Sequence, residues 1–136
     1  MKPDELMIGD WVFHPDLCYC IRVECLGLVD VFWNHDGAMS SVPYDTVQPY
    51  EIDEIFLREN GFVLLEVGDN GAATPAQYRN RFEKWMLHTK WQDVILWYDR
   101  RTKTYNLHNM NGARFRHVHQ LQHAMKLAGI GKDVEL

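Results

Sequence analysis

Apolar and polar residues alternate through much of the first 50 residues, and this pattern predicts a series of short strands. The alternation is clearest between residues 17 and 24, where one face would carry Leu17, Tyr19, Ile21 and Val23 and the other Cys18, Cys20, Arg22 and Glu24. A period of two is that of a half-buried strand. Further strands are expected over residues 8–13, 29–33, 39–42 and, as an edge strand, 47–50. Several short strands at this spacing favour a small β-barrel.

Residues typical of turns and helix caps occur between residues 34 and 73. Gly37 ends a turn over residues 34–37 and is expected to have a positive φ. Asp53 is placed as a helix N-cap, with Gly61 as the C′ residue and Phe62 as the apolar residue that follows such a cap. We therefore expect a short helix from Asp53 to Gly61, followed by a strand over residues 62–67 and a loop over residues 68–73.

Residues 74–89 allow two interpretations. Thr74-Pro75-Ala76-Gln77 fits a capping box with Pro at N1, and the helical spacing continues in Tyr78, Phe82, Trp85 and Met86. One interpretation is therefore a helix over residues 75–87. The other is a single helical turn followed by a strand over residues 82–89. We favour the second, because the segment that follows is clearly β and needs a partner strand.

The last third of the chain predicts a hairpin and a closing helix. Residues 94–98 form a strand, 99–103 a polar turn and 104–109 the return strand, and Asn111-Gly112 is a second hairpin signal. The closing helix has an apolar stripe of Val118, Leu121, Ala124, Met125 and Ala128.

The polar side of this closing helix carries His119, His123 and Lys126. We expect Leu121 to be buried and both histidines to be more exposed. Gly129 is placed to stop the helix at C′, and the next residue, Ile130, can make the apolar contact that accompanies such a cap.

These elements predict an α+β fold, with a small SH3-like β-barrel over residues 1–50 and, over residues 51–136, an antiparallel sheet packed against the C-terminal helix. The two units are expected to share one compact domain. The stretch Gly9-Asp10-Trp11-Val12 resembles the opening strand of SH3-like barrels. A content of 46% hydrophobic and 24% charged residues excludes a disordered chain.

Three further features concern compartment. No apolar run approaches the roughly 18 residues that cross a bilayer. The acidic start, residues 1–5, lacks the apolar stretch of a secretory signal. An odd number of cysteines, Cys18, Cys20 and Cys25, does not suit a disulfide framework, so we expect free thiols. We predict a cytoplasmic protein that does not bind membranes.

Three segments carry a family resemblance: Glu5-Leu6-Met7-Ile8-Gly9-Asp10-Trp11-Val12, Glu59-Asn60-Gly61-Phe62, and Val118-His119-Gln120-Leu121-Gln122-His123-Ala124. In these segments the chain resembles a family of small uncharacterised proteins found in gut-bacterial genomes, often among phage and mobile-element genes. The resemblance implies a β-rich N-terminal unit joined to an α+β C-terminal unit. It implies no activity.

Charge is distributed unevenly along the chain. The net charge is −10 over residues 1–80 and +5 over residues 81–136, within a total of −5. A group of basic residues and histidines, Arg114, Arg116, His117 and His119, stands at the start of the closing helix, where free N–H groups favour anions. We predict an anion-binding or partner-binding site there. The anion would be an internal Asp or Glu or an external ligand, and the third alternative is no specific site.

Two residue sets contain side chains of the kinds that bind metal ions. His14, Cys18, Cys20 and Cys25 lack the usual spacing of paired zinc ligands. His119 and His123 stand at i and i+4, with His117 and His108 nearby in sequence, but no Glu follows His119 as in the His-Glu-x-x-His pattern. We predict neither a metal site nor a cofactor.

Functional motifs are few. The sequence has no nucleophile elbow, phosphate-binding loop or dinucleotide fingerprint, so we do not expect an enzyme. The leading hypothesis is a non-enzymatic protein-interaction module of a bacterial phage or mobile element. The alternative is a nucleic-acid-binding accessory protein, in which stacking and phosphate contacts would come from Lys84, Lys90, Trp91, Arg100, Arg101 and Lys103.

Overall fold

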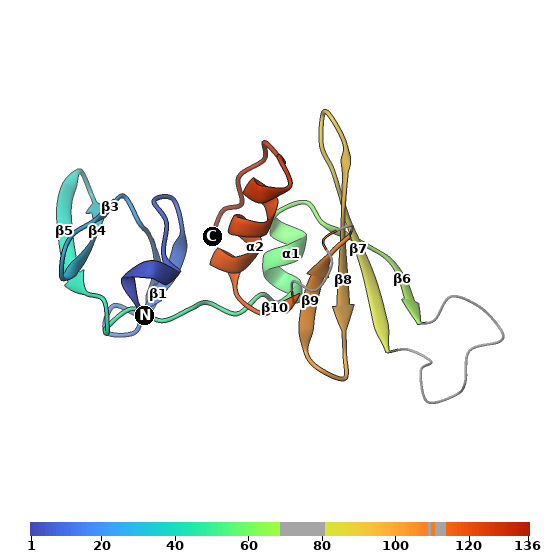
Figure 1. Ribbon diagram of the computed structural model, residues 1–136, viewed down its shortest axis with the longest axis horizontal. Helices are drawn as coiled ribbons and strands as arrows, with labels where there is room; N and C mark the ends of the chain where they lie inside the picture. The colour runs from blue at the N-terminus through green and yellow to red at the C-terminus, as the bar shows by residue number, and fades with distance from the viewer. Residues whose placement is uncertain (69–80, 109, 111–113) are drawn as a thin grey trace. The chain divides into compact units, whose positions relative to one another are not determined.

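The computed structural model describes residues 1–68, 81–108, 110 and 114–136 (Figure 1). Their contacts divide the chain into two units. Unit 1 consists of Met1–Glu51, His117–His123 and Glu135–Leu136, and unit 2 of Ile52–Arg116 and Ala124–Val134. Residues 117–123, which we assigned to the C-terminal unit, thus group with unit 1.

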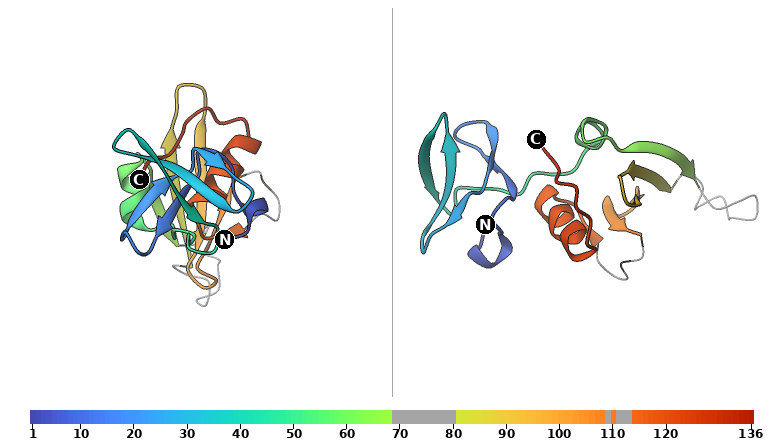
Figure 2. Two further views of the ribbon diagram at one scale, coloured as in Figure 1. Left: turned by 90° about the vertical axis from the view of Figure 1, so that its left-hand side faces the viewer. Right: turned by 90° about the horizontal axis from the view of Figure 1, so that it is seen from above.

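Unit 1 contains a short 3-10 helix and two antiparallel sheets, blue to cyan in Figure 2. The helix is η1 (Pro3–Glu5). A two-stranded sheet pairs β1 (Trp11–His14) with β2 (Tyr19–Arg22), and a three-stranded sheet has β3 (Cys25–Leu26), β4 (Asp30–His35) and β5 (Ala38–Pro43) in that order. No closed barrel is found among the described strands, so the SH3-like barrel stays a prediction.

The short strands of unit 1 bury one apolar side each. Its core consists of Leu6, Val12, Ile21, Val23, Val31, Trp33, Val42, Tyr44 and Val47. Of the predicted inner face of residues 17–24, Ile21 and Val23 are buried, whereas Leu17 and Tyr19 are exposed. The turn before β5 has Gly37 at a φ of +86°, as predicted. Residues 47–50 form only an isolated bridge, between Gln48 and Phe13 of β1.

Unit 2 is built on one five-stranded antiparallel sheet with the order β10-β9-β8-β7-β6. The strands are β6 (Val63–Gly68), β7 (Phe82–His88), β8 (Asp93–Asp99), β9 (Thr104–Leu107) and β10 (Arg114–Phe115). Residues 82–88 are therefore a strand, and the interpretation as a helix reaching residue 87 is wrong. Strand β7 pairs with β6 on one side and β8 on the other, which satisfies its backbone groups. The loop predicted over residues 68–73 lies outside the described residues except for Gly68, which ends β6, and so do the helical turn predicted from Thr74 and the Asn111-Gly112 turn.

The predicted short helix is α1 (Glu54–Glu59). The Asp53 carboxylate accepts a hydrogen bond from the N–H of Phe56 at 2.7 Å. At the other end Gly61 has a φ of +88°, and the N–H of Phe62 donates to the carbonyl of Leu57. Both predicted caps are confirmed.

The sheet of unit 2 has one buried face and one partly open face. Buried side chains from four strands line the first face: Trp85, Leu87, Val94, Leu96, Tyr105, Leu107 and Phe115. Helix α1, which buries Phe56 and Leu57, lies beside the sheet (Figure 1). On the other face the side chains of Lys84, Met86, Ile95, Trp97 and Asn106 stay partly exposed.

The closing helix is α2 (Val118–Leu127). It ends as predicted, with Gly129 at a φ of +72° and the N–H of Ile130 donating to the carbonyl of Met125 at 2.9 Å. Val118, Leu121, Ala124 and Met125 of the stripe are buried, whereas Ala128 is exposed. Among the described residues, neither α-helix has the length and hydropathy needed to cross a membrane.

The predicted exposure of His119 is wrong, since only 5% of its surface is accessible. Gln122, on the same polar side of α2, is also buried. The reason is that this side of the helix contacts the segment at the start of β1 within unit 1.

Candidate functional site

Two consecutive residues of α2 hold the start of β1. Gln122 accepts a hydrogen bond from the N–H of Trp11 and donates one to the carbonyl of Gly9, both at 2.9 Å. His123 places Nε2 2.8 Å from Oδ2 and 3.0 Å from Oδ1 of Asp10. Two segments that lie far apart in the sequence therefore contact each other, and these hydrogen bonds help to hold unit 1 together.

His119 lies one turn before His123 and is surrounded by aromatic rings. Its ring centroid is 5.9 Å from that of His117, with nearly parallel planes, and 5.8 Å from that of His123. Nδ1 of His119 is buried and has no hydrogen-bond partner among the described residues. Burial lowers the pKa of His119 to about 4, against the opposing effect of the nearby Asp10 carboxylate. The ring is therefore neutral at pH 7.

A cavity of about 620 Å³ opens beside these rings, entirely within unit 1. Three histidines line it from α2 and the residue before this helix: His117, His119 and His123. Three carboxylates line it from η1 and the segment after β5: Asp4, Glu5 and Asp45. The cavity thus combines neutral imidazole, available as hydrogen-bond donor or acceptor, with exposed negative charge.

The described residues of the two candidate metal sets, His14 with the three cysteines and the histidines near α2, are not arranged as metal-binding groups. Within the described residues, no group of three or more His, Cys, Asp or Glu side chains is arranged to hold a metal ion. In the N-terminal set the ring of His14 packs edge-on against Trp33 at 5.5 Å. The cysteines of that set are free thiols, and burial raises the pKa of Cys20 to about 11, which keeps it protonated.

The four residues of the predicted anion site fall into two groups. Arg114 and Arg116 belong to unit 2, and the Arg116 guanidinium donates to the carbonyl of Thr102. His117 and His119 belong to unit 1 and line the cavity. The four residues are neighbours in the sequence, which suggested one cluster. In the structure the two arginines belong to unit 2 and the two histidines to unit 1.

Backbone N–H groups at the start of α2 donate hydrogen bonds to other parts of the chain. The N–H of Val118 donates to the carbonyl of Tyr50 at 2.9 Å, and the N–H of His117 donates to the side chain of Gln120 at 3.1 Å. These bonds occupy two of the backbone donors that an external anion would have used.

The residues proposed for nucleic-acid binding are spread along unit 2. Lys90 and Trp91 lie in the β7–β8 turn, whereas the turn at the opposite end of β8 carries Arg100, Arg101 and Lys103. Arg100 is paired with Glu83 at 2.9 Å. Lys84 alone lies on the open sheet face, with Nζ 5.4 Å from the ring centroid of Trp97.

That open face contains a polar cross-strand row that sequence reasoning missed. Trp97 stands directly opposite Lys84 on β7 and Asn106 on β9, and Asn106 stands opposite Arg114 on β10. Only the pairing register could have shown this row, because its members come from four strands. Asp99, on the same face of β8, is bound by Arg81, whose hydrogen bonds lower the pKa of the carboxylate to about 2.

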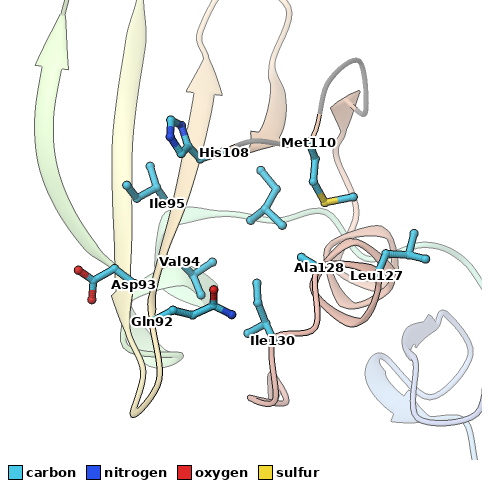
Figure 3. Close-up of a pocket in the computed structure, with 10 residues that line it drawn as sticks. Gln92, Asp93, Val94, Ile95, His108, Met110, Leu127, Ala128 and Ile130 are labelled. Carbon is cyan, nitrogen blue, oxygen red and sulfur yellow. The ribbon is translucent and has the colours of Figure 1, made fainter.

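A second cavity, of about 390 Å³, lies at one end of the sheet of unit 2 (Figure 3). The apolar part of its lining is Val94, Ile95, Leu107, Met110, Leu127, Ala128 and Ile130. Val94 and Ile130 point toward each other across this groove in Figure 3. Leu127 lines it although 81% of the leucine surface is exposed.

No protein-family model, no curated protein and no solved structure matches this chain.

Proposed function

We propose that this protein is a non-enzymatic protein-interaction module, and that the groove of unit 2 binds an extended segment of a partner protein. The observation that carries the proposal is a stretch of β8 beside that groove with which no described residue pairs on one side. Addition of a strand to a free sheet edge is a common mode of peptide recognition, in which backbone hydrogen bonds supply affinity and side-chain pockets supply specificity.

The free edge follows from the unequal lengths of β8 and β9. The N–H of His108 donates to the carbonyl of Ile95, just beyond the end of β9 at Leu107. In an antiparallel pair, the backbone groups of alternate residues point to the same side. Those of Asp93 therefore point to the side of Ile95, and among the described residues no strand pairs with Asp93 there.

The surroundings of this edge supply the side-chain pocket. Val94, Leu107 and Ile130 line the groove, and Leu127 extends its apolar surface into solvent. Trp91, in the turn that precedes β8, is 82% exposed. Trp and Met are enriched in protein interfaces, whose centres are depleted of charge. An extended segment with apolar side chains at alternate positions matches this surface.

The proposal is tested with two matched leucine variants. Leu127→Asp places a charge at the groove, and Leu28→Asp changes a leucine of unit 1 that is 98% exposed. Peptides selected on the wild-type protein from a library of extended sequences should lose at least about tenfold in affinity for Leu127→Asp, as at a binding hot spot. They should bind Leu28→Asp as they bind the wild type. Equal affinity for all three proteins would contradict the groove as the site.

Hydrogen exchange provides a second measurement of the same proposal. Addition of a strand would engage the amide of Asp93, so its exchange should slow when peptide is bound. The amide of His108, which is already bonded to Ile95, is the internal reference. Peptide binding without protection of Asp93 would contradict strand addition.

The polar row on the open sheet face favours nucleic acid as a second candidate partner. An aromatic ring in a row with basic side chains binds single strands by stacking and phosphate contacts. In this row Lys84 stands directly opposite Trp97, and Arg114 lies two strands away, beyond Asn106. Salt-sensitive retardation of a single-stranded oligonucleotide that is lost in Lys84→Glu and Arg114→Glu, and retained in Lys2→Glu of unit 1, would establish it. Retardation unaffected by these changes would exclude this face.

The cellular setting is proposed from the family resemblance. A binding module encoded by a phage or mobile element of a gut bacterium would act in the host cytoplasm. An SH3-like arrangement of unit 1 would agree with a binding role, although function is decided by sites rather than by folds.

A further inference from the structure

We infer that the cavity of unit 1 is a second binding site, for an organic cation that carries an ammonium or guanidinium group. The site is formed by His117, His119 and His123 on one side and by the carboxylates of Asp4, Glu5 and Asp45 on the other. It is independent of the groove in unit 2.

Charge determines the class of ligand. Unit 1 contains ten Asp and Glu residues against Lys2 and Arg22, a net charge of −8. No Lys or Arg lines the cavity, and the carboxylates of Asp4 and Asp45 have no hydrogen bond or ion pair within the described part of the chain. A concave surface lined by one sign of charge concentrates ligands of the opposite sign.

Met1 also lines the cavity. The α-ammonium of Met1 donates to the carbonyls of Tyr44 and Val47, at 2.6 and 3.1 Å. These bonds go to backbone oxygens, so they leave the side chains of Asp4 and Asp45 available to a ligand.

The unpartnered ring of His119 is the second, independent observation. Its Nδ1 is buried without a hydrogen bond among the described residues, although a buried polar atom without a partner costs about 1–3 kcal/mol. A neutral imidazole has one nitrogen that donates and one that accepts. A ligand N–H group that reaches the ring of His119 would meet a neutral imidazole that can accept a hydrogen bond, whereas an anionic ligand would meet three carboxylates.

The size of the cavity agrees with an organic ligand rather than a bare metal ion. A volume of about 620 Å³ lies within the range of small-molecule sites. A divalent metal would need several ligands within about 2.5 Å of one point, and the described side chains offer no such group.

The experiment is an NMR titration of the full chain that follows the histidine ring signals. The probes are N-acetyl-arginine amide and N-acetyl-lysine amide, with N-acetyl-norleucine amide as the uncharged control. We expect saturable shifts of the His119 and His117 signals with the two cations only, which weaken at 0.5 M salt because the charges are exposed. Equal shifts with the norleucine probe, or no saturable shift with either cation, would overturn the inference.

Matched variants locate the cation. Asp45→Asn should weaken binding of the arginine probe about two- to fivefold, as expected for one exposed charge pair. Asp36→Asn, in the β4–β5 turn of the same unit, is the control; its side chain is 94% exposed and does not line the cavity. His119→Phe should abolish the shift of His117. Equal weakening by Asp45→Asn and Asp36→Asn would overturn the site, as would displacement of the probe by stoichiometric Zn²⁺.

A pentapeptide with a central arginine, Gly-Gly-Arg-Gly-Gly, distinguishes the two sources of the cation. Binding at least tenfold tighter than that of the arginine probe identifies an arginine side chain of a partner protein as the ligand. Equal affinity identifies a free small-molecule cation. Either result supports the inference, and it can hold whether or not the groove of unit 2 binds peptides.

Discussion

Nε2 of His123 lies 2.8 Å from Oδ2 of Asp10, a residue with no exposed surface, although 113 positions separate the two in the chain. The same carboxylate accepts a hydrogen bond from the N–H of Met7 at 2.7 Å. A buried carboxylate is tolerated when hydrogen bonds and an opposing group compensate for lost hydration. The polar side of α2 therefore contributes to the stability of unit 1.

Removing His123 should destabilise the protein, contrary to the expectation from the helical pattern. His123→Ala leaves the Asp10 carboxylate buried with one partner fewer, so the free energy of unfolding should fall by about 2–4 kcal/mol. The matched control is His88→Ala, because His88 pairs with Asp93 at an exposed position where such pairs contribute at most about 1 kcal/mol. Urea denaturation of both variants measures the difference, and equal losses would contradict a structural role for the buried pair.

Leu121 should be among the most sensitive positions of the closing helix. It is completely buried, in the middle of the apolar stripe, so Leu121→Ala should lower the free energy of unfolding by about 2–5 kcal/mol. Leu127→Ala changes the same residue type on the same helix at a position that is 81% exposed, and should cost less than about 0.5 kcal/mol. Chemical denaturation checks both values, and a loss below 1 kcal/mol for Leu121→Ala would refute its central position in the core.

Mild acid should destabilise the fold through His119. Its pKa is about 4 in the folded protein and about 6.5 in an unfolded chain, so the unfolded state binds more protons between these values. Stability should therefore fall as the pH falls from about 6.5 to 4, by up to about 3 kcal/mol from this residue, with no further contribution below pH 4. His119→Phe removes the titration, so its unfolding free energy should depend less steeply on pH in this window. An unchanged slope would mean that His119 titrates normally.

The three thiols should be free but unequal in reactivity. Cys18 and Cys25 are exposed, whereas Cys20 is partly buried and its pKa is raised to about 11, which suppresses the reactive thiolate. In the native protein a thiol reagent at pH 8 should label two cysteines rapidly and the third much more slowly. Denaturant should make all three equally reactive. Labelling of only one cysteine in non-reducing denaturant would reveal a disulfide.

Features that depend on a few neighbouring residues were predicted from the sequence. The caps of α1 at Asp53 and Gly61, the stop of α2 at Gly129 and the positive φ of Gly37 are confirmed. Each follows from local sterics or from a hydrogen bond within about five residues, so distant parts of the chain hardly affect it. The α+β class and the antiparallel pairing followed from the same local patterns.

Only the tertiary structure decided the features that depend on distant partners. Residues 82–88 allowed both a helix and the favoured strand, and pairing with β6 and β8 on both sides decided for β7. His119 and His123 were expected to be more exposed than Leu121. His123 is partly exposed and pairs with Asp10, whereas His119 is buried, because the segment at the start of β1 contacts that side of α2. Helical periodicity shows which side chains share a face of a helix. Whether a polar face is exposed or buried depends on which segment packs against it. For α2 that segment lies more than 100 residues earlier in the chain.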